Sequence, residues 1–288
     1  MRQGPIHEFT FYSHTSCDNF ELDQIIFHLS RNHTVKKLRL ALDFQYSYKL
    51  PLSAYSLNQL TYLYLRYVDI DHQPIFSGFG SLRSLSLYYV KISTKALLHL
   101  LSNCPSLKRF SLLGSICDKD CTIIELFDCL HVIEDLTICG YNAHQFVLDS
   151  VPEELSTSLI HLKYFCFKEM CLDGDDHLTF LAVLLKCSPN LEHIELEAKL
   201  GYKDENEIYS GILEKYSDVW MEHLKELVIY NFNNSKPSME FVKFIIVRSP
   251  KLKKLLISSV VDEKDEELEM LKVLLQAPRA SPVEIVVK

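Results

Sequence analysis

The sequence predicts an α/β fold in which a short strand and a helix alternate along the whole chain. A six-residue pattern, here called the phrase, recurs along the chain, as at 60–65 and 82–87. Its first, fourth and sixth residues are apolar. Ten copies begin 22 to 33 residues apart, and segments with helical apolar spacing separate several of them. A period of roughly 20–29 residues with this phrase is typical of a leucine-rich repeat solenoid. We therefore expect a curved parallel β-sheet on the concave face and helices on the convex face.

Each phrase is expected to be one strand, because its last two apolar residues alternate with a residue that points to the opposite side. The apolar pair then enters a core shared by neighbouring repeats, since one repeat alone buries too little apolar surface. The phrases begin at Ile6, Val35, Leu60, Leu82, Leu107, Ile133, Leu162, Leu191, Leu224 and Leu252. Val283, Ile285 and Val287 alternate in the same way and predict a closing strand.

Several segments between the phrases have helical apolar spacing after a residue that can cap a helix. Residues 94–102 predict one such helix, and Asp18 with Glu21 resembles a capping box before another. The further candidate caps are Asp175 or Asp176, Ser238 and Asp265. A proline shortly after three of these helices marks their ends, because proline interrupts helical hydrogen bonding.

The composition is that of a folded intracellular chain. Hydrophobic residues make up 48% of the 288 residues, and the unbroken repeat favours one elongated body. No run approaches the ~18 apolar residues of a membrane span, so no membrane partner is predicted. Nine cysteines without a Cys-x-x-Cys pair favour free thiols in a reducing compartment, which places the protein in the cytoplasm and/or nucleus.

The charge distribution argues against a nucleic-acid partner. The formal net charge is −8, and residues 1–150 contribute −1 of it. Residues 151–288 contribute the remaining −7. General nucleic-acid binding requires an excess of basic residues.

No motif predicts catalysis, a cofactor or a metal. The chain has no phosphate-binding loop, no Gly-x-Ser-x-Gly and no His-Glu-x-x-His, so we expect no enzyme. The spacing of Cys117, Cys121, Cys129 and His131 fits no compact zinc motif. The acidic runs at 173–176 and 262–267 lack the spacing of a calcium-binding EF-hand loop and are better explained as helix N-termini.

Alternation along the strands predicts which side chains line the concave face, and we hypothesise that this face binds a protein. Its early part is basic and aromatic and its late part acidic, and tyrosine and arginine often anchor interfaces. The alternative is an ordinary solvated sheet surface. Trp220 is expected to be a core anchor between repeats. The predicted binding residues are Lys37, Arg39, Tyr62, Tyr64, Arg66, Tyr88, Arg109, Tyr164, His193, Glu195, Glu197, Glu226 and Tyr230.

Two parts of the chain resemble a known plant family. The segments at 30–32, 50–52 and 98–107, the last with Asn103-Cys104-Pro105, resemble the leucine-rich region of plant F-box proteins. The segments at 223–229, 239–244 and 250–255 resemble the FBD domain of those proteins, and 278–286 resembles its closing strand. The resemblance implies a leucine-rich repeat region at 1–215 and FBD-like repeats at 216–288, continuous with the solenoid.

The family resemblance implies a protein-recognition role. Such proteins act as substrate receptors of cullin–RING (SCF) ubiquitin ligases, in which the F-box binds a Skp-type adaptor and the repeats capture an as yet unnamed target protein. The first phrase already begins at Ile6, so no F-box fits before it. Two interpretations follow: a truncated receptor, which binds the adaptor only if an F-box exists upstream of Met1, or a ligase-independent interaction scaffold.

Overall fold

The computed structural model describes most of the chain and divides it into two compact units. The described residues are 4–13, 19–32, 34–45, 48–70, 79–114, 121–143, 145–147, 159–171, 175–199, 212–259 and 264–288. The N-terminal unit comprises residues 1–133 and 145–147, and the C-terminal unit comprises residues 134–144 and 148–288. The predicted boundary at 215/216 lies inside the C-terminal unit and stays a prediction.

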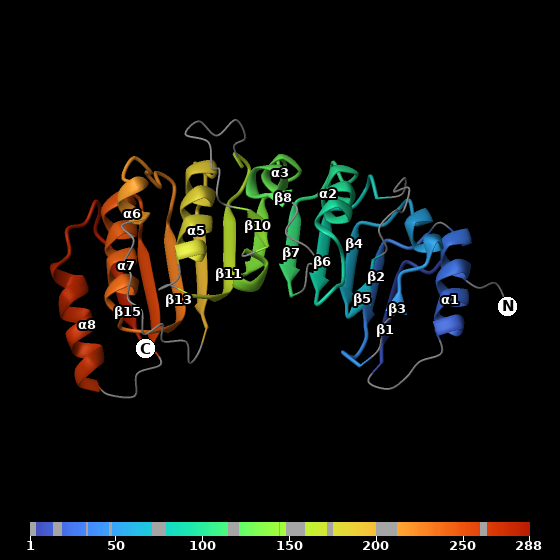
Figure 1. The fold of residues 1–288 in the computed structure, drawn as a ribbon, viewed down its shortest axis with the longest axis horizontal. Helices are drawn as coiled ribbons and strands as arrows, with labels where there is room; N and C mark the ends of the chain where they lie inside the picture. The colour runs from blue at the N-terminus through green and yellow to red at the C-terminus, as the bar shows by residue number, and fades with distance from the viewer. Residues whose placement is uncertain are drawn as a thin grey trace. The chain divides into compact units, whose positions relative to one another are not determined.

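In the N-terminal unit, consecutive phrases form neighbouring parallel strands, coloured blue to green in Figure 1. The sheet contains β1 (Glu8–Tyr12), β2 (Lys37–Ala41), β4 (Tyr62–Arg66), β6 (Ser84–Tyr88) and β7 (Arg109–Leu113). Two small parallel pairs lie beside it, namely β3 (Tyr48–Lys49) with β5 (Val68–Asp69), and β8 (Cys121–Thr122) with β10 (Phe146–Val147). Its helices are α1 (Asn19–Asn32), the 3-10 helix Leu52–Ser56, α2 (Thr94–Ser102) and α3 (Ile123–Asp128).

The C-terminal unit repeats the same arrangement. Its parallel strands are, in order, β9 (Asp135–Cys139), β11 (Tyr164–Met170), β12 (His193–Ala198), β13 (Glu226–Phe232), β14 (Lys254–Ser259) and β15 (Glu284–Val287). Its helices are α4 (Gly140–Ala143), α5 (Asp175–Cys187), α6 (Ile212–Lys215), α7 (Lys236–Arg248) and α8 (Lys264–Gln276). Figure 1 shows α5 and α7 packed against one side of these strands.

The strands confirm the phrase-to-strand prediction, and the leucine-rich repeat fold follows from it. Each of the ten phrases contains one strand, and the predicted closing strand is β15. The two apolar residues of each strand between β1 and β15 in the main sheet are buried, as with Leu38 and Leu40 in β2, which are fully inaccessible to solvent, whereas those of the terminal strands β1 and β15 are half-buried. The register aligns them with Leu63 and Leu65 of β4, so the leucines of neighbouring repeats form continuous buried rows. Each repeat therefore completes its core against the next one.

Local signals explain where α2 and α3 begin, but two predicted caps do not match the structure. Helix α2 spans the predicted residues 94–102, and the Ser93 hydroxyl caps it by accepting the Ala96 N–H at 3.2 Å. Thr122 and Glu125 form a capping box at α3. The prediction that Ser238 caps α7 is wrong, because Ser235 accepts the Ser238 N–H and is the cap. Helix α8 begins at Lys264, ahead of the position that a cap at Asp265 would require.

Several strands end in the same backbone turn. The residue five positions after the strand start has a positive φ at Tyr67, Tyr89 and Glu169, with values of 54°, 52° and 51°. Asn231 and Gly114 adopt it in two further strands. This left-handed conformation disfavours bulky residues, so holding two tyrosines there requires a compensating gain from the surrounding structure.

Trp220 contradicts the sequence prediction. It is 56% exposed, whereas its neighbours Val219 and Met221 are buried. The single tryptophan is therefore not a core anchor, because the two residues that flank it enter the core instead.

Candidate protein-binding face

The open face of each sheet consists of the strand side chains that alternate with the buried leucines. In the N-terminal unit the register arranges them in three rows that cross the strands. The predicted residues of this unit occupy the first row (Lys37, Tyr62 and Arg109), the second row (Arg39 and Tyr64) and the third row (Arg66 and Tyr88). The three rows contain four lysines and arginines and one carboxylate, so this face is positively charged.

Four of these side chains form a contiguous group, the tyrosine–arginine cluster of Tyr12, Arg39, Tyr64 and Tyr88. The Arg39 guanidinium lies 4.1 Å from the ring centre of Tyr64 and 5.4 Å from that of Tyr12. The Tyr64 and Tyr88 rings are 5.1 Å apart. Cation–π and ring contacts hold the arginine and the tyrosines in a fixed arrangement before any ligand binds.

A second group of aromatic side chains, the aromatic edge of Phe44, Tyr67 and Tyr89, follows the ends of three neighbouring strands. Tyr67 and Tyr89 are the two tyrosines with positive φ, and their rings stack at 5.1 Å and 11°. Phe44 meets Tyr67 edge-on at 6.4 Å and is 69% exposed. The Arg66 guanidinium lies 5.2 Å from the Tyr67 ring centre, so this arginine connects the aromatic edge with the open face.

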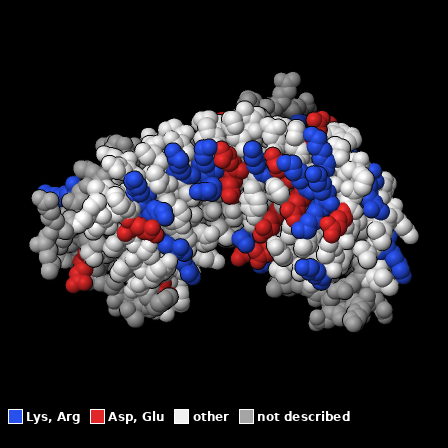
Figure 2. Space-filling model, turned by 180° about the vertical axis from the view of Figure 1, so that it is seen from behind, with Lys and Arg blue, Asp and Glu red and all other residues white. Residues whose placement is uncertain are grey.

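The open face of the C-terminal unit differs because carboxylates outnumber lysines on it, and both of its lysines are paired with glutamates. Its three rows carry two lysines and five carboxylates. Lys168 binds Glu197 at 2.8 Å, and Lys254 binds Glu226 at 2.8 Å. The view from behind in Figure 2 shows lysines and arginines next to carboxylates at several places on that side of the molecule. Of the predicted residues, Tyr230 is 40% exposed at the end of this face.

Tyr164, Cys166 and Glu195 form a hydrogen-bonded group on this face. The Tyr164 hydroxyl donates to Glu195 at 2.6 Å, and the Cys166 thiol donates to the same carboxylate at 3.8 Å. Burial, followed by the hydrogen bond to Glu195, raises the pKa of Tyr164. Burial, with the Glu195 charge, raises the pKa of Cys166 to about 12. The Cys166 thiol therefore stays protonated near neutral pH and is a poor nucleophile.

Glu226 predicts a pH dependence of stability. The hydrogen bond from Lys254 is the main cause that lowers its pKa from the ordinary 4.5, and His193 lies 3.3 Å away on the other side. A carboxyl with a lowered folded-state pKa stabilises the fold above its ordinary pKa, and this contribution is lost as the pH falls through the folded value.

We expect Glu226→Gln to lower the urea midpoint of the chain slightly at pH 6, because partly exposed ion pairs contribute little. The difference from wild type should shrink as the pH falls below about 4.5 towards the lowered folded-state pKa, because the carboxyl becomes protonated first in the unfolded and then in the folded chain. Urea titrations at pH 6, 4 and 3 measure it. A difference that stays constant across this series would contradict the assigned role of Glu226.

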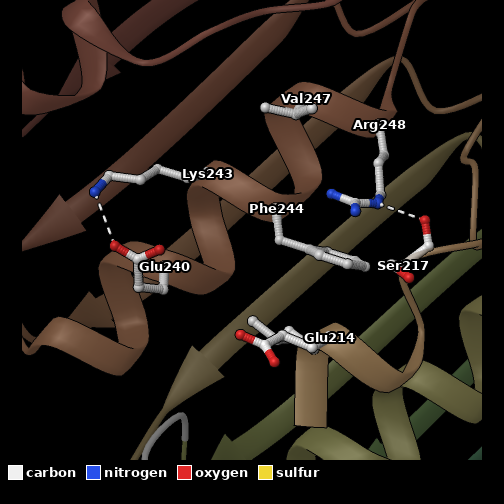
Figure 3. A pocket seen from close by; sticks show the side chains of 8 residues that line it. Glu214, Ser217, Glu240, Lys243, Phe244, Val247 and Arg248 are labelled. Atoms are coloured by element: carbon white, nitrogen blue, oxygen red, sulfur yellow. Dashed lines mark hydrogen bonds and ion pairs between the residues drawn. The ribbon is translucent and has the colours of Figure 1, made fainter. Parts of the chain in front are cut away.

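A shallow groove of about 430 Å³ lies between α6 and α7 in the C-terminal unit. Figure 3 shows Lys243 turned towards Glu240 and Arg248 turned towards Ser217. Lys243 binds Glu240 at 2.9 Å, and Arg248 lies over the Phe244 ring at 4.3 Å while donating to the Ser217 carbonyl at 3.3 Å. These charged groups find partners inside the chain, which leaves Glu214 as the remaining charged residue among those that line the groove.

Metal and membrane sites find no support in the described ranges. No group of three or more His, Cys, Asp or Glu side chains there could hold a metal ion. Cys117, like Asp173 and Asp262 of the acidic runs, lies outside those ranges. Cys121 is buried, and the Cys129 thiol forms a hydrogen bond of 3.3 Å with the Ser102 hydroxyl. No described helix has the length and apolar character needed to cross a bilayer.

Sequence reasoning missed several residues that shape these faces. Tyr12, Lys168 and Lys254 occupy open-face positions, and the same alternation would have identified them. The aromatic edge lies beyond the last predicted row. Its only sequence signal is a bulky residue directly after two neighbouring strands, at Tyr67 and Tyr89.

Comparisons with known proteins agree with the repeat architecture. A family model described as "FBD-associated F-box protein At5g56370, LRR repeats" matches residues 24–153. The chain is 24% identical to the F-box/FBD/LRR-repeat protein At1g13570 of Arabidopsis thaliana over 332 aligned residues, covering 98% of this chain and 79% of that protein.

Two solved structures are also similar. The leucine-rich repeat protein LegL7 of Legionella pneumophila is 13% identical, with a TM-score of 0.39 and coverage of 93% of this chain and 96% of that one. An internalin of Listeria monocytogenes is 12% identical, with a TM-score of 0.39 and coverage of 90% and 77%.

Proposed function

We propose that this chain, a leucine-rich repeat protein of the plant F-box/FBD/LRR kind, binds a target protein through the open face of its N-terminal unit. In this proposal it serves as the target-binding part of an F-box-type ubiquitin-ligase receptor. The adaptor role comes only from similarity to proteins named for an F-box, because fold alone does not determine function.

The observation that carries the proposal is the tyrosine–arginine cluster. Protein interfaces are anchored by tyrosine and arginine side chains that are held rigid and placed centrally. Arg39 and Tyr64 sit in the middle row of this face and are already ordered by mutual contact at 4.1 Å. Binding there loses little side-chain entropy, which favours affinity.

The test identifies a partner by affinity capture with the tagged chain from plant extract and then measures Kd for the purified partner. Tyr64→Ala and Arg39→Glu should each weaken binding at least tenfold, because anchor residues commonly contribute 2 kcal/mol or more. Tyr141→Ala, an exposed tyrosine on α4, and Lys163→Glu, an exposed lysine ahead of β11, are the matched controls.

Two outcomes would count against parts of this proposal. If Tyr64→Ala and Arg39→Glu variants keep their fold by circular dichroism and still bind the partner as wild type does, this face is not the site. If the full-length gene product does not co-purify with a Skp-type adaptor, the partner is held by a ligase-independent scaffold.

A further inference from the structure

The arginines on the open face of the N-terminal unit have no acidic partner among the residues that the structure describes. Among the described residues, Arg39, Arg66 and Arg109 make no ion pair and no hydrogen bond, and the guanidinium groups of Arg39 and Arg66 lie over aromatic rings. On the open face of the C-terminal unit, Lys168 and Lys254 each bind a glutamate of a neighbouring strand. In the N-terminal unit Lys37 pairs with Glu8 at 3.3 Å, so among the described residues it is the arginines of this face that are left without a carboxylate.

Arg39 shows the lack of a hydrogen-bond acceptor most clearly. Its Nε atom is buried and meets no hydrogen-bond acceptor in the described part of the chain. The rings of Tyr12 and Tyr64 hold the guanidinium in place without accepting its N–H groups. A buried donor without an acceptor is unfavourable, and the planar guanidinium is suited to paired hydrogen bonds with a carboxylate.

The spacing of Arg39 and Arg66 defines what could bind both. Ala41 of β2 is in register with Arg66 of β4, so the two arginines lie one strand and two residues apart. Their Cα atoms are therefore separated by about 8 Å, given a strand spacing of about 4.8 Å and a rise of about 6.6 Å over two residues. In an extended peptide, residues i and i+2 lie on one side, separated by about 6.6 Å. Two carboxylates at alternate positions match this pair of arginines.

We infer that the open face of the N-terminal unit binds an extended acidic segment of the target protein, with Asp or Glu at two alternate positions. These carboxylates pair with Arg39 and Arg66, and neighbouring apolar side chains pack on the rings of Tyr64 and Tyr88. The inference rests on the proposed function and specifies the chemistry of the target. A protein segment is favoured over a nucleic acid because the formal net charge of the chain is −8.

The test selects binders to the full chain from a display library of random dodecapeptides. Peptides that require Tyr64 should be enriched in Asp and Glu at alternate positions. Binding of a synthetic selected peptide should fall at least tenfold with Arg39→Gln/Arg66→Gln, and also when its acids are replaced by amides. Lys163→Gln/Lys253→Gln removes the same charge from exposed lysines of the C-terminal unit and should leave affinity within twofold.

The contrary results separate this inference from the proposed function. Selected peptides that need Tyr64 but carry no excess of acids would overturn the inference and leave the binding face intact. Unchanged affinity in the arginine double variant would do the same, as would a dodecameric oligothymidylate that binds this face more tightly than the peptides. If no selected peptide depends on Tyr64, both the inference and the proposed face are rejected.

Discussion

Gly140→Ala is expected to destabilise the C-terminal unit by about 3 kcal/mol, near the upper end for an overpacked core. A Cβ atom at this position would lie 2.5 Å from the carbonyl oxygen of Glu169 and 2.6 Å from Cε1 of His177. Neither neighbour can move away without cost. Glu169 is the left-handed residue at the end of β11, and His177 is buried with 5% exposure.

Both ring nitrogens of His177 form hydrogen bonds, so the ring cannot easily move away from a side chain added at position 140. Its Nδ1 accepts the Cys171 N–H at 2.8 Å, and its Nε2 lies 3.0 Å from the Gly140 carbonyl oxygen. Since Nδ1 is an acceptor, Nε2 carries the proton and donates to Gly140. The Phe167 ring packs against the imidazole with a centroid distance of 5.6 Å. Alanine at 140 would displace this whole group.

Thermal and urea unfolding of the full chain measure the effect of Gly140→Ala. Gly80→Ala is the control, because a Cβ at Gly80 meets no atom within 4 Å. The control should unfold as wild type does, within about 0.5 kcal/mol. If the Gly140→Ala chain were as stable as the Gly80→Ala chain, the structure around Glu169 and His177 would accommodate the added methyl group at little cost in free energy.

Gly114→Ala is expected to destabilise the N-terminal unit by about 2–3 kcal/mol, because two independent costs add. Gly114 has a φ of 97°, a conformation that residues with a side chain rarely adopt. A Cβ atom there would also lie 2.5 Å from Cδ1 of Tyr89 and 2.8 Å from its Cα. The Tyr89 ring cannot move freely, since it stacks on Tyr67.

Tyr89→Ala separates these two costs. In the double variant with Gly114→Ala, the clash with the Tyr89 ring is absent, while the φ strain and the contact with the Tyr89 backbone remain. We therefore expect the Gly114→Ala substitution to cost less in the Tyr89→Ala background, but still more than 1 kcal/mol, as measured by urea unfolding of all four chains. An equal cost in both backgrounds would mean that the ring clash is irrelevant.

The repeat itself could be predicted from sequence because its signal is local and periodic. Each phrase contains its own alternation, so burial of Leu38 and Leu40 follows without knowledge of the neighbours. Helix α2 was likewise specified by adjacent residues, namely the Ser93 cap and the apolar spacing up to Leu101. The open-face positions followed from the same alternation.

What could not be predicted depends on contacts between repeats. The pairing of Lys168 with Glu197 requires the register of two strands whose residues are 29 positions apart in sequence. Trp220 was misassigned because hydrophobicity alone cannot show that Val219 and Met221 take the buried positions on either side. The left-handed tyrosines carry no recognised sequence signal, since bulky residues are rare in that conformation.

The positive-φ residue that recurs near the strand ends bears on how the sequence of a repeat protein can change during evolution. A residue with positive φ stands five positions after the strand start at Tyr67, Gly114 and Asn231, although the segments that follow differ in length. The phrases at 60 and 82 are 22 residues apart and those at 191 and 224 are 33 apart, yet both pairs of strands align in parallel register. Insertions and deletions between strands can therefore accumulate over evolution while the arrangement of side chains that meets a partner stays the same.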